Sequence, residues 1–218
     1  MNARHATLVA LLAVASVTGC SGTAWILTKT IGPFVPEEKV HAEYDLKGRS
    51  VVVLVDVKEP MLASEFPRLE VLLAEAIGKE LAAHNACGPI VPAHRVEAAR
   101  LAEPKFATWS IAEIGHYFNV DTVLHLELFE FRLRDTPSSN AYHGYAEAAV
   151  RLVSPEKGEQ VWPALSAARV MTAETMPDVN PEQPTEQESV LIEGFAAKIS
   201  RNFYTYKKAD LPLRPKVK

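Results

Sequence analysis

The chain lacks the short motifs that identify the commoner enzymes. Its 218 residues contain no Gly-x-Gly-x-x-Gly loop, no Walker-type lysine loop, no nucleophile elbow and no His-Glu-x-x-His pair. These absences count against nucleotide binding and against the commoner hydrolases. The chain also lacks an excess of positive charge, because 23 Lys and Arg face 27 Asp and Glu. A phosphate backbone requires a basic face, so we expect no nucleic acid partner.

What the chain does have is enough apolar material for one folded domain. Hydrophobic residues make up 48% of the sequence, which excludes wholesale disorder. A length of 218 residues suits one compact domain with appendages better than two full domains.

The amino terminus carries an apolar run that stops at a cysteine, "LLAVASVTGC" from Leu11 to Cys20. The run is too short to cross a bilayer, which needs about 20 residues, but it suits the apolar region of a signal peptide. Its end, Val17-Thr18-Gly19-Cys20, resembles the lipobox of bacterial lipoproteins. The alternatives are a plain secretory signal or a buried helix that happens to be followed by a cysteine.

The lipobox resemblance implies cleavage between Gly19 and Cys20, a diacylglyceryl group on the Cys20 thiol and an acylated new amino terminus. Several acyl chains together hold a protein stably on a membrane, whereas one does so only marginally. By analogy with that family, Ser21 in place of Asp favours the outer membrane. We therefore expect an exported protein that faces the periplasm and binds the membrane through its lipid.

Cysteine is otherwise scarce, since the only other one is Cys87 in "HNACGP". With Cys20 consumed by lipid, we expect no disulfide. Cys87 is then expected to be a free thiol that packs as a small apolar residue rather than a reactive group.

Four segments follow from these signals and from composition. Residues 1–19 are the expected signal peptide, and residues 20–49, with two prolines and a charge cluster, the expected lipidated tether. Residues 50–204 are the expected α/β domain. Residues 205–218 form a basic, proline-broken tail.

Apolar periodicity predicts the elements of that domain. Residues 50–57 form a continuous β-branched run, typical of a buried central strand, and residues 64–86 carry a helical stripe with Ser64 as its expected N-cap. Ser110 and Glu113 form a predicted capping box for a helix that ends at Asn119. Further predicted elements are a strand at 88–92, a helix at 93–102, a hairpin of 121–135 with 142–154, strands at 159–163 and 167–174 that extend the meander, and a helix at 184–204.

This order predicts the α/β (α+β) class. We expect a single sandwich of two or three layers around a mixed sheet, with a βαβ-like first half and an antiparallel meander in the second. Leu73 and Ile77 should pack against Leu126 and Val150 of the sheet.

The stretch "IGHYFNVDTVLHLELFEFRL", the hairpin and a Gly-x-x-Val-Trp turn resemble a group of envelope domains. The group comprises the amino-terminal domain of TolB, the penicillin-binding-protein activator lipoproteins and the curli-secretion lipoproteins. The resemblance covers residues 50–204 in the order of elements. It implies a periplasmic, membrane-tethered module that docks to other proteins, and it carries over no functional residue.

Two places could carry chemistry. His125 and Glu127 share one face of a strand, because side chains repeat every two residues, and the hairpin register should bring Arg151 and Glu147 near them. Arg151 would repel a metal, so a cross-strand cluster of ion pairs is the simpler interpretation. Asp56 lies near the carboxyl end of the first strand, where open α/β sheets bind ligands, although a turn residue that ends the strand is the simpler interpretation there too.

Three functions remain open at this point. The first is a non-enzymatic docking or assembly module for an unidentified envelope protein, with no catalytic residue, cofactor or metal. Its candidate contact is the hairpin tip from Arg134 to His143, including Asp135 and Asn140, since loops on a rigid sheet often carry recognition. An ordinary solvated turn is the plainer interpretation of that tip. The other two functions are a periplasmic hydrolase that uses the His125 and Glu127 face, and a sensor that binds a small ligand at Asp56 in an apolar cleft.

Overall fold

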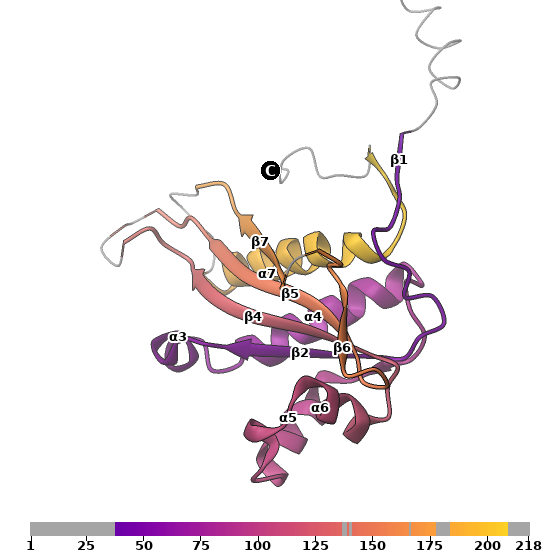
Figure 1. Ribbon diagram of the computed structural model, residues 1–218. Coiled ribbons are helices and arrows are strands. Elements are labelled where there is room, and N and C mark those ends of the chain that lie inside the picture. The colour runs from indigo at the N-terminus through magenta and orange to yellow at the C-terminus, as the bar shows by residue number, and fades with distance from the viewer. Residues whose placement is uncertain (1–37, 137–138, 140, 166, 178–183, 209–218) are drawn as a thin grey trace, which may run out of the picture. The chain divides into compact units, whose positions relative to one another are not determined.

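A computed structural model describes residues 38–136, 139, 141–165, 167–177 and 184–208 (Figure 1). The chain divides into two compact units, of which the larger contains residues 40–206. In the smaller unit, Lys208 Nζ lies 2.9 Å from a carboxylate oxygen of Glu38. Two short strands, β1 (Lys39–Val40) and β8 (Tyr206–Lys207), form a sheet of their own.

The larger unit is built on a six-stranded mixed sheet. The strands are β2 (Val51–Val57), β3 (Ile90–Val91), β4 (Thr122–Arg132), β5 (Tyr145–Ser154), β6 (Glu159–Trp162) and β7 (Arg169–Glu174). β2 lies between β3 and β4 and is parallel to both. β5 runs antiparallel to β4, and β6 and β7 both run antiparallel to β5. The predicted hairpin and the mixed sheet are therefore confirmed.

Helices cover both faces of this sheet, so the α/β sandwich has three layers (Figure 1). α4 (Leu69–Ala83) and α7 (Pro184–Ser200) pack on one face, and α5 (Ala93–Ala102) and α6 (Ile111–Phe118) pack on part of the other. The remaining helical pieces are α3 (Pro60–Glu65), η2 (Phe106–Thr108) and η3 (Arg201–Phe203).

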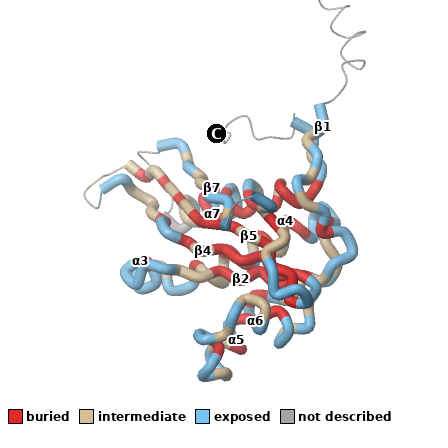
Figure 2. Tube along the Cα trace, viewed as in Figure 1, coloured by how far each residue is buried: buried red, intermediate tan, exposed pale blue. Residues whose placement is uncertain are grey.

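The main core lies between the sheet and the pair α4 and α7. The predicted contacts are confirmed: Leu73, Ile77, Leu126 and Val150 are each at most 1% exposed and belong to one apolar cluster. Figure 2 shows this burial along the strands and the exposure of the hairpin end. A smaller cluster under α5 and α6 covers the other face only around the amino-terminal half of β2 and β4.

Two helix boundaries read from the sequence are confirmed. The Ser110 side chain accepts a hydrogen bond from the Glu113 backbone N–H, and the Glu113 carboxylate accepts one from the Ser110 backbone N–H. Asn119 ends α6 in the left-handed region at a φ of 52°. Asparagine tolerates that region, which explains why it serves as a stop there.

The predicted start of the long helix is wrong. Ser64 lies inside the short helix α3 and caps nothing, and a break at residues 66–68 separates α3 from α4. Pro67 is the cause, because its ring disfavours helical geometry at the residue before it and it has no N–H to donate. Phe66 accordingly adopts a φ of −124° and a ψ of 69°.

The predicted continuation of the meander is confirmed for β6, which pairs with β5, and is wrong for β7. β7 does not pair with β6; both pair with the same edge of β5, β6 opposite residues 152–154 and β7 opposite residues 145–150. They are two pieces of one edge, interrupted after Trp162. Pro163 follows there and cannot donate to a ladder.

The folded unit also includes residues before position 50. Leu46 is fully buried in the main core, and the backbone N–H groups of Glu43 and Tyr44 donate to the Asn202 carbonyl. Part of the segment expected as tether is thus packed against the domain.

Candidate functional site

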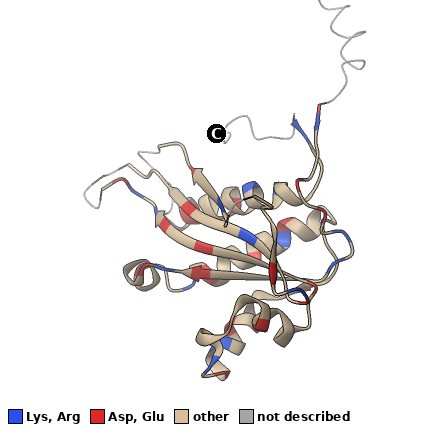
Figure 3. Ribbon diagram, viewed as in Figure 1, with Lys and Arg blue, Asp and Glu red and all other residues tan. Residues whose placement is uncertain are grey.

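The half of the sheet face that α5 and α6 leave uncovered carries the residues singled out from the sequence. We call this surface the open face; its members are Asp56, Lys58, Glu127, Glu130, Glu147, Ala149, Arg151, Val170 and Thr172, and Phe129 lies at the bulge of β4 next to Glu130. Directly paired residues on neighbouring strands point to the same side, which places them together. Figure 3 shows the resulting acidic and basic positions along β2, β4 and β5.

His125 connects this face to the interior. It is 2% exposed, its Nε2 lies 2.7 Å from Asp56 Oδ2, and its Nδ1 accepts a hydrogen bond from Arg151 Nε at 3.0 Å. Arg151 Nη2 also donates to Glu127 Oε1 at 2.9 Å. Of the four residues predicted to lie together, His125, Glu127 and Arg151 do form a cluster, whereas Glu147 contacts Tyr145 instead. Asp56 joins the cluster.

The cluster continues in both directions as a chain of alternating charge, which we call the charge network. Arg100 donates to Asp56 at 2.7 Å and to Glu70 at 2.9 Å on one side, and Lys58 lies 3.7 Å from Glu127 on the other. Glu147 lies apart from it and accepts instead from the Tyr145 hydroxyl at 2.6 Å.

Two members of this network also cover the edge of β2 beyond its short pairing with β3. Glu70 Oε1 accepts from the Val57 backbone N–H at 2.9 Å, and Arg100 Nη2 donates to the Val55 carbonyl at 2.7 Å. Side chains that occupy edge groups prevent another strand from pairing there. This edge is therefore not available as a docking strand.

These contacts occupy both ring nitrogens of His125. An arginine N–H always donates, so Nδ1 is the acceptor toward Arg151, and Nε2 is the nitrogen that faces Asp56. A general base needs a free lone pair within reach of the proton that it removes, and this ring offers none.

Asp56 is held as a carboxylate by its neighbours. Burial alone would raise the pKa of Asp56, but the hydrogen bond from His125 and the positive charge of Arg100 outweigh it and lower that pKa. Asp56 lies inside β2, paired with Glu127, rather than in a turn after it. Its role here is that of an acceptor in the network.

The small cavity at the edge of β2, where Arg100 approaches, is not lined by Asp56 and is too small for a typical ligand. Its volume is about 70 Å³, and it is lined by Val53, Val55 and Arg100. Pockets for small molecules usually measure about 300–1,000 Å³. The structure also groups no three His, Cys, Asp or Glu side chains for a metal within the residues that it describes.

The hairpin tip is held together by its own side chains where it is described. Arg134 donates to the Tyr142 hydroxyl, and its guanidinium lies 4.3 Å from the centre of that ring. His143 Nδ1 lies 2.9 Å from Asp135 Oδ1, and its Nε2 lies 2.6 Å from Glu174 Oε1 at the end of β7. The hydrogen bond to Asp135 is the main cause that raises the pKa of His143. Asn140 lies outside the described residues.

The predicted lipidation residue Cys20 and the predicted cleavage residue Gly19 also lie outside the described residues. Cys87 is a free, half-buried thiol, and burial raises its pKa. No helix in the part of the chain that the structure describes is long and apolar enough to cross a membrane.

One surface feature was missed by the sequence analysis, a groove of about 570 Å³ between α4 and α7. The apolar periodicity of the sequence identifies the side of α4 that packs on the sheet. The groove lies next to that side. It becomes visible only when α7 is placed next to α4.

No protein-family model matches the chain, and no curated protein matches it. Solved structures similar to it include a PelC dodecamer from Paraburkholderia phytofirmans, at 12% identity over 79% of this chain and 100% of that one, with a TM-score of 0.44. Lipoprotein GNA1162 from Neisseria meningitidis has 15% identity over 70% and 98%, with a TM-score of 0.42. The LpoB C-terminal domain from Salmonella enterica has 13% identity over 67% and 94%, with a TM-score of 0.35. These likenesses assign no function, partner or site residue to this chain.

Proposed function

We propose that this protein is a membrane-anchored periplasmic lipoprotein whose α/β domain docks another protein of the cell envelope and performs no catalysis. The open face is the observation that carries the proposal. Its charged side chains all have hydrogen-bond or ion-pair partners within the domain, while Val170 is 60% exposed on this face and Phe129 is 44% exposed at the bulge of β4. Apolar anchors surrounded by paired charges are the composition of a protein-protein interface.

The proposed contact runs along this face to the hairpin tip at residues 134–143, because β4 and β5 lead directly into that tip. The contacts of Arg134 with Tyr142 and of His143 with Asp135 support a pre-organised base for this loop. A loop already held in one conformation loses less entropy on binding than a free one. The membrane anchor in the proposal depends on the Gly19-Cys20 pattern and localises the domain near its partners.

The anchor is tested by labelling with radioactive palmitate in a diderm bacterium. The wild-type chain should take up label and sediment with outer membranes, and Cys20→Ala should do neither. Cys87→Ala is the matched control and should behave as wild type. A Cys20→Ala chain that keeps its leader and still sediments through a lipid would contradict the anchor.

Docking is tested with a photo-cross-linking phenylalanine analogue in place of Phe129 or Val170. Both positions should cross-link to one defined envelope protein, and the same analogue at Leu101, 84% exposed on α5, should not. Exchange of residues 134–143 for a short glycine-containing turn should abolish these cross-links. Equal cross-linking from all three positions would overturn the proposal.

The hydrolase alternative makes the opposite prediction about the charge network. His125→Gln removes the imidazole at a position that is 2% exposed and so does not contact a partner, and it should leave the cellular function intact as long as the circular dichroism spectrum shows a folded chain. His125→Asn serves as the second variant if His125→Gln does not fold. Loss of function in a folded variant, together with a silent exchange of the tip, would favour the enzyme.

A further inference from the structure

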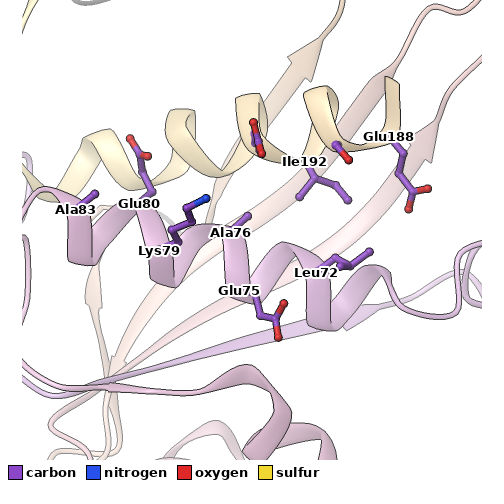
Figure 4. A pocket seen from close by; sticks show the side chains of 10 residues that line it. Leu72, Glu75, Ala76, Lys79, Glu80, Ala83, Glu188 and Ile192 are labelled. Atoms are coloured by element: carbon purple, nitrogen blue, oxygen red, sulfur yellow. The ribbon is translucent and has the colours of Figure 1, made fainter. Parts of the chain in front are cut away.

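The groove between α4 and α7 lies on the side of the domain away from the open face, since both helices cover the opposite face of the sheet. Its floor is apolar and contains Leu72 and Ala76 of α4 and Ile192 of α7 (Figure 4). The volume exists because α4 presents alanine at positions 76 and 83 along this side, where larger side chains would close the gap between the helices.

The rim of the groove is acidic. Four carboxylates line it, those of Glu75, Glu80, Glu188 and Glu193, and among the lining residues they face the single ammonium group of Lys79. Glu80 is fixed in place, because its Oε1 accepts a hydrogen bond from the Tyr204 hydroxyl at 2.8 Å. An anionic rim around an apolar floor attracts a basic, amphipathic partner and repels phosphate groups and anionic lipid.

The walls also restrict the secondary structure of the occupant. Both walls are helices, whose backbone groups are bonded within themselves, so an extended peptide would find no ladder partner. An amphipathic helix needs no such partner, since its apolar stripe alone fills a groove. The stretch of α4 from Leu72 to Ala83 spans about 17 Å at a rise of about 1.5 Å per residue, the length of about three helical turns.

We infer that this groove binds a basic amphipathic helix of a partner protein. Apolar side chains at positions i, i+3 or i+4, and i+7 of that helix contact the floor, and Lys or Arg side chains on its flanks meet the carboxylates of the rim. The inference deepens the proposed docking function, on which it rests, by naming a second surface and the chemistry of its ligand.

The test measures fluorescence anisotropy of a labelled 14-residue helical peptide with leucines on one face and lysines on both flanks, titrated with the full-length chain in a neutral detergent. Blank micelles are the reference. The lysine peptide should bind with a dissociation constant that rises at least about tenfold in Glu188→Lys/Glu193→Lys. Glu97→Lys/Glu103→Lys changes the net charge equally, on α5 and at its C-cap, and should change the dissociation constant less than about twofold. A matched peptide with glutamate flanks should bind at least about tenfold more weakly than the lysine peptide.

Binding that is equal for both peptides, equal for both double variants, or absent up to millimolar chain overturns the inference. If the peptide binds the monomeric chain but not the self-associated chain, the groove is occupied by a second copy of this chain. That result also overturns the inference. The cross-links from Phe129 and Val170 separate the two proposals: if they persist while the peptide fails, only the groove is wrong.

Discussion

The two faces of the central sheet are built from alternate residues of the same strands and yet differ in almost every respect. On β4, Leu124, Leu126 and Leu128 point into the core beneath α4 and α7, and all three are fully buried. The residues between them, His125 and Glu127, belong to the charge network on the other side. Half of the side chains of β4 therefore stabilise the core, and the alternate half form the polar contacts of the surface.

This difference indicates where the domain can tolerate substitutions. The face under α4 and α7 gains its stability from close packing, which is sensitive to the loss of any buried methyl group. The open face is ordered by hydrogen bonds between charged groups. The effect of a substitution there on stability depends on whether it leaves a buried polar partner without a hydrogen bond.

The largest expected effect lies on the packed face. Leu73→Ala removes a side chain that is 1% exposed, and it should lower the free energy of unfolding by about 2–5 kcal/mol in urea denaturation. Leu101→Ala, at 84% exposed, should change it by less than about 0.5 kcal/mol. A cost below about 1 kcal/mol for Leu73→Ala, against the range expected for buried leucines, would show that α4 is not packed on the sheet.

A smaller effect is expected at the charge network. Asp56→Ala leaves the buried His125 Nε2–H without its acceptor, so the free energy of unfolding should fall by about 1–3 kcal/mol at neutral pH. Glu130→Ala is the control on the same strand, since its carboxylate is 47% exposed and pairs with Arg132 at the surface. If Asp56→Ala and Glu130→Ala lowered the free energy of unfolding equally, the charge network would be shown not to be buried.

The sign of the pH dependence follows from the lowered pKa of Asp56. The folded state holds this carboxylate ionised to a lower pH than the unfolded state does. Its stabilisation is therefore present above the pKa of the unfolded chain and is lost as the pH falls through the folded pKa. The stability difference between wild type and Asp56→Ala should accordingly shrink in acid.

The smallest effect on stability is expected at the hairpin tip, because exposed ion pairs contribute little. The pKa of His143 should lie above 6.5 by nuclear magnetic resonance titration, because Asp135 and Glu174 both favour the protonated ring. Stabilisation from this pair is fully present below the unfolded pKa and is lost as the pH rises through the folded one.

Asp135→Asn should lower the pKa of His143 more than Glu174→Gln does, since the hydrogen bond to Asp135 is the larger cause. Both variants can be followed by the same titration. A pKa of His143 at or below 6.5 in the wild-type chain would show that His143 and Asp135 do not form this contact in solution.

Local signals predicted most of the fold. The capping box at Ser110 and Glu113 is a property of neighbouring residues, and the alternation along β4 follows from the period of a strand. The break at Pro67 was also present in the sequence, but the apolar stripe continued across it and the periodicity outweighed the proline. The pairing of β7 with β5 carried no local signal, because the edge that a strand joins depends on the path of the intervening loop.

By itself, the sequence determined the class of the domain, the two-sided character of its strands and the grouping of His125, Glu127 and Arg151, because each follows from spacing along one or two adjoining segments. Only the tertiary structure decided that Asp56 and Arg100 complete this network and that α4 and α7 enclose an acidic groove. These features join residues from elements far apart in the chain, such as Leu72 and Ile192. These residues are brought together by the packing of whole helices and strands. The periodicity of the sequence gives information about one element at a time and does not predict that packing.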